Sequence, residues 1–364
     1  MLFLHLLPFE ILYDKDAFIY IFLIPDKRCM RKIVVIACLY FFNVLSVKAQ
    51  DPHFSQFFAS PLTLNPAFTG KFNGNFRIAG NYRDQWPTIN RAYQTSTAAI
   101  DFPILRNKIA SNDIWGVGLM GYSDKSAAGA VSFNYISLST AFHKGLDEEG
   151  YSQIGAGFQA TYSNMIIDPS NLKFEDQLTP FGFTGVTSET FANSTLKSSY
   201  FDMNAGLLYT TSTTDRNNLY VGVSVYHINR PKQNFNSGAE FLINPRSTIH
   251  AGGYFGLGQN TTLHLSALYT SQAKAHETVA GGAFEFSTGD PYNPLSLYAG
   301  SWIRLNDAII PYVGIEFNSF RLGITYDINT SVLKTASESR GGLEISLIYL
   351  NKKPDSKGVP CPKF

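Results

Sequence analysis

The feature that most constrains the fold is an alternation of apolar with small or polar residues, which recurs in segment after segment. Between positions 219 and 226, for example, leucine and valine side chains would lie on one face, and tyrosine, glycine and serine side chains on the other. A period of two residues is typical of a β-strand whose two faces meet different surroundings. The chain is therefore expected to fold into strands with one apolar face.

About fourteen such segments follow one another, most of them about 9–12 residues long, which suits a tilted membrane-spanning strand. Charged residues make up only 16% of the chain and aromatic residues 14%, against about 25% charged in ordinary soluble domains. Composition alone also allows a soluble β-sandwich or β-helix. Because an even strand number suits closure, we predict an all-β fold, a closed antiparallel transmembrane β-barrel of about 14 strands within residues 75–350. The expected strands cover residues 75–83, 92–102, 113–123, 131–143, 151–164, 199–210, 218–227, 246–255, 261–271, 276–287, 295–304, 308–317, 320–327 and 340–350.

One expected strand contains a proline. Pro311 falls within residues 308–317 and has no N–H to donate to a neighbouring strand. We therefore expect it near the start of the strand or at a bulge.

The residues before the barrel resemble an export signal. From Met30, a short positive region leads into an apolar run, and Val47-Lys48-Ala49 resembles a small-residue cleavage site. Residues 30–49 are therefore predicted to be a secretory signal peptide with cleavage after Ala49. The alternative is a transmembrane anchor, but roughly fifteen apolar residues are short for one. Residues 1–29 are predicted to come from an over-called start codon.

The next segment, residues 50–74, is rich in proline and phenylalanine. Prolines at this spacing exclude a regular helix and an interior strand. Fourteen strands would enclose a lumen too wide for wall side chains alone to fill. We therefore expect this segment to pack at the periplasmic mouth of the barrel or inside it, with a turn at Asn65-Pro66. Apolar burial is the large energy available to it, so its expected anchors are Phe54, Phe57, Phe58 and Phe68.

The sequence offers no convincing catalytic or metal-binding motif. The histidines after residue 49 do not have the spacing of metal ligands, and no cysteine pair remains there. Ser266 and His264 would share the polar face of one strand, which allows the hypothesis of a barrel hydrolase. Because 29 Lys and Arg balance 28 Asp and Glu, the charge does not favour nucleic-acid binding. We predict no enzyme activity, no cofactor, no metal and no nucleic-acid partner.

Residues 50–102 carry a dense set of motifs. They are Gln56 with its aromatic neighbours, Leu64-Asn65-Pro66-Ala67, Gly70, Asn81-Tyr82-Arg83, Gln85-Trp86-Pro87, and the alternating Tyr93, Ser96 and Asp101. Together they resemble the start of the PorP/SprF family, outer-membrane proteins of the Bacteroidetes type IX secretion system. Beyond residue 102 the resemblance is one of architecture, length and a C-terminal Cys361-Pro362, and residues 1–29 fit no family pattern.

This resemblance implies an outer-membrane barrel that associates with periplasmic ring and peptidoglycan-linked components of the secretion machine. SprF-like members are linked to the delivery or surface retention of large adhesins, including those of gliding motility. We therefore predict a non-enzymatic protein of the outer membrane, in contact with its lipid, that binds or anchors a secreted adhesin or its C-terminal signal domain. The expected partner-binding residues are Phe54, Gln56, Phe57, Asn65, Pro66, Phe68, Arg83, Gln85, Trp86 and Cys361.

Arg83, Gln85 and Trp86 are expected at the rim of the barrel, and Cys361 in a periplasmic tail, residues 351–364. Two alternatives remain open. Residues 50–74 would be a structural plug without a partner, or the protein would be an outer-membrane channel or hydrophobic-solute transporter.

Overall fold

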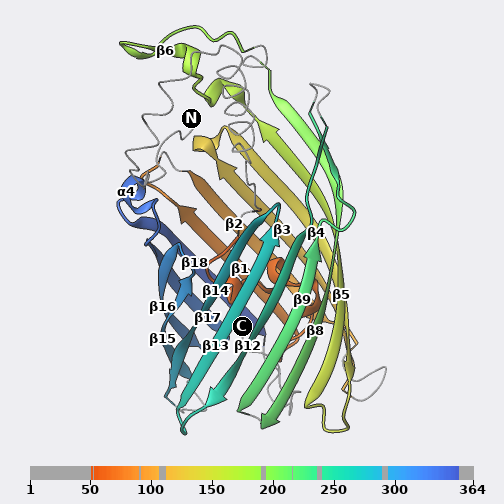
Figure 1. The fold of residues 1–364 in the computed structure, drawn as a ribbon. Coiled ribbons are helices and arrows are strands. Elements are labelled where there is room, and N and C mark those ends of the chain that lie inside the picture. The colour runs from red at the N-terminus through yellow and green to blue at the C-terminus, as the bar shows by residue number, and fades with distance from the viewer. Residues whose placement is uncertain are drawn as a thin grey trace, which may run out of the picture. The chain divides into compact units, whose positions relative to one another are not determined.

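The computed structural model describes residues 51, 53–89, 92–105, 112–189, 194–214, 216–235, 240–288 and 294–351. Within them, antiparallel strands form a closed barrel (Figure 1). Its fourteen strands are β1 (Phe76–Gln85), β2 (Tyr93–Pro103), β3 (Ile114–Ser126), β4 (Val131–Gly145), β5 (Ser152–Ile167), β8 (Leu196–Thr214), β9 (Asn217–Tyr226), β12 (Arg246–Gly256), β13 (Thr261–Gln272), β14 (Ala275–Ser287), β15 (Leu295–Arg304), β16 (Ala308–Phe317), β17 (Phe320–Asn329) and β18 (Arg340–Asn351). The first and last strands pair with each other and close the sheet.

The predicted fold is confirmed, because each expected segment corresponds to one barrel strand. Pro311 is the fourth residue of β16, near its start as expected. The pairing of β16 with β17 passes from Ile309 opposite Ile328 directly to Tyr312 opposite Thr325, so the missing N–H falls in a gap of this ladder. The expected signal peptide, the preceding residues 1–29, and the tail from residue 352 with Cys361 lie outside the described residues.

The two faces of the barrel wall differ as in a membrane protein. In β8, Phe201 is 71% exposed and Met203 is also exposed, whereas Asp202 and Asn204 between and beside them are buried. Leu138 in β4 is 66% exposed. Side chains alternate across a strand, so apolar residues cover the outside and polar residues line the inside. This arrangement suits a barrel surrounded by lipid.

Short elements connect the strands. They are η3 (Ala127–Gly129), η4 (Pro169–Asn171), the hairpin of β10 (Lys232–Asn234) and β11 (Glu240–Leu242), and α4 (Lys334–Ser337). The described part of a second compact unit, residues 173–187, holds η5 (Glu175–Gln177) and a hairpin of β6 (Leu178–Thr179) and β7 (Gly182–Phe183). In the described part of the chain, no helix is long and apolar enough to cross a membrane.

The barrel has two unlike ends. At one end, called here the terminal end, β1 begins and β18 ends, and Phe76 lies opposite Asn351. At the other, the loop end, the chain leaves β5 and β9 and returns at β8 and β12 through its two longest connections. With these two ends defined, each side chain in the lumen can be placed nearer the terminal end or nearer the loop end.

The segment before β1 forms three short helices, η1 (Phe57–Ala59), α3 (Pro61–Leu64) and η2 (Pro66–Phe68). Prolines stand at the first turns of α3 and η2, where the missing N–H would be unpaired in any case. Asn65 caps η2, because its side chain accepts a hydrogen bond from the Ala67 N–H at 2.8 Å. Local sequence thus explains why the segment folds into turns rather than into a strand.

Candidate functional site

The segment before β1 lies inside the barrel, and we call Asp51 with residues 53–72 the plug. Asp51 binds Gln272, the last residue of β13, at the loop end. Gly70 donates its N–H to Asp101 of β2 at 2.8 Å, near the terminal end. The plug therefore runs the length of the lumen, and its orange turns are visible between the strands in Figure 1.

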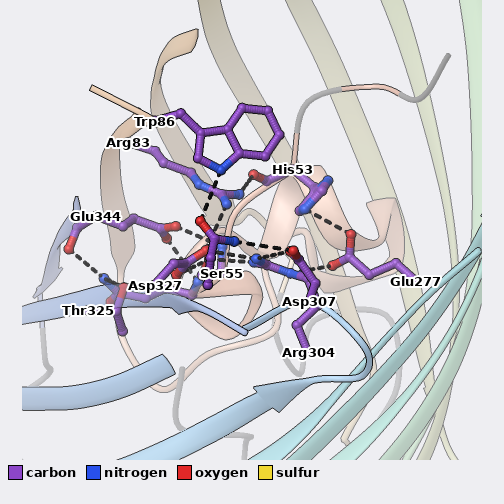
Figure 2. Close-up of polar contacts among 12 residues, drawn as sticks. His53, Ser55, Arg83, Trp86, Glu277, Arg304, Asp307, Thr325, Asp327 and Glu344 are labelled. Carbon is purple, nitrogen blue, oxygen red and sulfur yellow. Dashed lines mark hydrogen bonds and ion pairs between the residues drawn. The ribbon is translucent and has the colours of Figure 1, made fainter. Parts of the chain in front are cut away.

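A network of buried charged side chains holds the plug just before η1 (Figure 2). Asp327 of β17 accepts from Arg83 Nη2 at 2.9 Å and from Arg304 Nη1 at 2.8 Å, and Ser55 Oγ donates to it at 2.8 Å. Glu344 of β18 accepts the backbone N–H groups of Ser55 at 2.7 Å and Gln56 at 2.9 Å. Residues of β17 and β18 thus bind two consecutive plug residues.

Such groups are stable in the lumen because each has an ion-pair or hydrogen-bond partner. Burying an ion without a partner costs several kcal/mol, and the penalty is offset where geometry and additional hydrogen bonds are good. Arg83 also donates to the His53 carbonyl, and His53 Nε2 lies 2.8 Å from Glu277. The plug completes the pairing of the wall, so plug and wall stabilise each other.

Asn65 fixes the middle of the plug to backbone groups of the wall, at a place where the wall residues are glycines. Asn65 Nδ2 donates to the carbonyls of Leu207 at 3.0 Å and Val223 at 3.1 Å. On the inner face of β5 and β8 stand Gly157 and Gly206, where a Cβ would overlap the plug at Ala67 and Asn65, respectively. Glycine is needed at these positions because the plug backbone approaches so closely.

Aromatic contacts complete the interface. Phe58 stacks on Trp302 with ring centroids 4.5 Å apart, and it meets Tyr312 edge-on at 5.5 Å. Phe68, fully buried, lies 5.8 Å from Tyr220 and 5.3 Å from His250. Aromatic pairs in these geometries add roughly 0.5–1.5 kcal/mol each beyond the burial of their area.

At the loop end, His227 anchors the first described residue of the plug. Its Nε2 lies 2.8 Å from an Asp51 oxygen and its Nδ1 2.9 Å from an Asp202 oxygen. Arg246 Nη1 lies 3.5 Å from the same Asp51 oxygen. Burial opposes a charge on the imidazole, but the neighbouring Asp51 and Asp202 carboxylates outweigh it and raise the pKa of His227 to about 9.

We expect the anchor at Asp51 to weaken as pH rises from about 6.5 to about 9. A raised pKa means that the folded state binds the proton more tightly, so the stabilisation is complete below the unfolded pKa and is lost above the folded one. Hydrogen exchange of the amides of residues 53–57 between pH 6.5 and 10, corrected for intrinsic rates, measures this. In the variant His227→Asn, the loss of amide protection with rising pH should disappear. An unchanged pH dependence in that variant would contradict the assignment of the effect to His227.

The structure places most of the expected partner-binding residues inside the barrel. Six of them lie in the plug and are buried: Phe54, Gln56, Phe57, Asn65, Pro66 and Phe68. Arg83 is also buried, and the expectation of a rim position for it is wrong, because β1 continues to Gln85. Gln85 and Trp86 are partly exposed at the loop end, where Trp86 Nε1 donates to Asn329 at 3.2 Å.

Sequence reasoning did not connect the plug to the wall residues that receive it, above all Asp327, Arg304 and Glu344. The alternation of β17 and β18 does place Asp327 and Glu344 on their polar faces, which was the available signal. Their partner Ser55 lies more than 270 residues away in the sequence, so no local pattern connects them.

The residues considered for a hydrolase site have other contacts. Ser266 Oγ accepts from Trp302 Nε1 at 2.9 Å, and His264 Nε2 lies 2.8 Å from Glu285. Among the described residues, no group of three or more His, Cys, Asp or Glu side chains could hold a metal ion.

Comparison with known proteins gives a family match and distant fold matches. The family model "Type IX secretion system membrane protein PorP/SprF" matches residues 46–349. No curated protein matched the sequence. Similar solved structures include the Pseudomonas putida toluene transporter TodX, 10% identical with a TM-score of 0.49, covering 83% of this chain and 95% of that one. Another is a Pseudomonas aeruginosa FadL homologue, 10% identical with a TM-score of 0.46, covering 80% and 94%.

Proposed function

Because the chain belongs to the PorP/SprF family of type IX secretion system membrane proteins, we propose that this outer-membrane barrel acts by binding and not by catalysis. It holds a secreted surface adhesin through the adhesin's C-terminal signal domain. It also joins that adhesin to periplasmic ring and peptidoglycan-linked components of the machine. Adhesins of gliding motility belong to the class of partner that this role would serve.

One observation supports binding over conduction. The lumen is occupied by a segment of the chain itself, tied to the wall by Asp51 at one end, by Ser55 and Gln56 near it, and by Gly70 at the other. A solute pathway along the axis would require this segment to leave its partners. The proposal therefore assigns function to the two ends of the barrel.

The loop end is the surface for the adhesin. Outer-membrane barrels have long extracellular connections and short periplasmic turns, so the β5–β8 and β9–β12 connections put the loop end outside the cell. Gln85 and Trp86 are partly exposed there, followed by the exposed Pro87 and Thr88. An amphipathic tryptophan beside polar residues is suited to a protein contact. The terminal end then faces the periplasmic components.

The test is affinity purification from outer membranes solubilised in mild detergent, with partners identified by mass spectrometry. We expect a large secreted protein and periplasmic ring components to copurify. A barrel recovered alone under these conditions, and conducting solutes in planar bilayers, would overturn the proposal in favour of a channel.

The variant Trp86→Ala sharpens this test. We expect it to reduce recovery of the secreted protein about tenfold or more, as for an interface tryptophan, and to leave recovery of periplasmic components unchanged. Trp115→Ala is the matched control, because Trp115 is an outward-facing tryptophan at the terminal end, 42% exposed. Equal recovery from both variants would remove Trp86 from the contact.

A further inference from the structure

A cavity lies between the plug and one side of the wall, in the half of the lumen nearer the loop end. The space that protein atoms leave unfilled there is about 960 Å³ when the solvent at its open side is included. Plug residues from Asp51 to Leu64 form one side, and residues of β3, β4, β5, β8, β9, β12 and β13 form the other. The network around Ser55 and Asp327 lies on a different part of the wall, so the cavity is a separate feature.

Two deeply buried polar side chains that line the cavity have an atom without a hydrogen-bond partner in the described part of the chain. They are Tyr122, 6% exposed, through Oη, and Asp202, 3% exposed, through Oδ1. Arg246 also lines the cavity, and its Nε has no hydrogen-bond partner among the described residues. Leaving a buried polar group unpaired costs about 1–3 kcal/mol, so a ligand that pairs these atoms would recover that cost on binding.

Flat aromatic faces stand beside these polar atoms. Tyr122 and Tyr135 stack with ring centroids 4.4 Å apart and planes 5° from parallel, and Phe133 lies 5.8 Å from Tyr135. All three line the cavity. The guanidinium of Arg246 covers the ring of Tyr226 at 4.3 Å, so that ring is already occupied on one side.

The chemistry of the unpaired atoms selects the ligand class. Asp202 Oδ1 only accepts, Arg246 Nε only donates, and Tyr122 Oη does both. A carboxylate or phosphate would satisfy donors but be repelled by Asp202, and an apolar molecule would satisfy none. Hydroxyl groups both donate and accept, and the C–H face of a sugar ring packs on an aromatic ring. From this combination we infer that the cavity binds a saccharide, with Tyr122, Asp202 and Arg246 as its polar contacts and Tyr135 and Phe133 as its apolar ones.

The test is titration of the purified full-length barrel, in a detergent without a sugar head group, with maltose, cellobiose, lactose and N-acetylglucosamine by calorimetry. We expect saturable binding of at least one of them. In Tyr122→Phe, which removes only the unpaired hydroxyl, affinity should fall about tenfold, the worth of one good hydrogen bond. Folding should be unimpaired, because the hydroxyl lost had no partner.

Tyr312→Phe is the matched control, because Tyr312 is also buried in the lumen but packs against Phe58 and Trp302 instead of lining this cavity. Its affinity should equal that of the wild type. Failure of all four saccharides to bind, equal affinity in both tyrosine variants, or displacement of the sugar by triglycine would overturn the inference, the last by identifying an amide ligand. Competition by purified lipopolysaccharide would assign the sugar to the membrane's own lipid, and its absence to a soluble saccharide.

Discussion

The substitution Gly157→Ala is expected to displace the plug from the wall at β5. A Cβ there would overlap the Ala67 nitrogen and the Pro66 carbonyl carbon. The wall has little freedom to yield, because β5 is paired along its length with β4 on one side and β8 on the other. Overpacking of this kind costs roughly 1–3 kcal/mol, and here the displaced atoms are backbone, so we expect the upper part of that range.

The measurement is chymotrypsin digestion of the folded barrel in detergent. In the wild type the plug phenylalanines Phe54, Phe57 and Phe68 are buried and should resist cleavage, whereas in Gly157→Ala they should be cut at least tenfold faster. Gly121→Ala is the control, since nothing lies within 4 Å of a Cβ at that position of β3. If both variants were as resistant as the wild type, the close packing of plug on β5 would be refuted.

Asp327→Asn should be the most damaging single polar substitution in the lumen. Asp327 serves Arg83 and Arg304 together, with contacts of 2.9 Å and 2.8 Å. The amide keeps the shape but removes the charge, so two buried guanidinium groups lose their shared partner. Breaking a buried ion pair from one side costs roughly 3–5 kcal/mol. We expect a corresponding loss in the unfolding free energy of the refolded barrel, measured by urea titration in lipid vesicles.

Glu338→Gln provides the comparison. Glu338 pairs with Arg340 at 3.7 Å, but the two side chains are 69% and 57% exposed. Exposed pairs of this kind contribute less than about 1 kcal/mol, so this variant should unfold close to the wild type. A similar loss in both variants would show that burial does not set the strength of the Asp327 network.

The barrel was predictable from the sequence because the alternation of apolar and polar residues within each strand indicates its two faces. The apolar positions of β9, for example, are the exposed ones, and the same alternation of exposed and buried residues runs through β5 and β8. The phenylalanine anchors of the plug were predictable for a similar reason, since a Pro-rich segment can be held by little except apolar burial. Both inferences need only local information.

The polar attachment of the plug was not predictable, because it depends on which strands face each other across the closed lumen. Arg83 illustrates the difference. Its alternation with the exposed Tyr82 already indicates the inner face, but the rim was expected because the strand was drawn two residues too short. That its guanidinium meets Asp327 and the His53 carbonyl follows only once fourteen strands and the plug are placed together.

The course of the plug also constrains the order of assembly. Asp51 lies at the opposite mouth from the start of β1, so the chain must cross the whole lumen before its first strand begins. Passing the folded segment through a finished cylinder would take the Asp51 carboxylate out of water before it reached its partners His227 and Arg246. We expect instead that the sheet forms around the segment and that the pairing of β1 with β18 forms last. Biogenesis of this protein would then be an encapsulation, in which a segment translated before β1 becomes the template around which the wall closes.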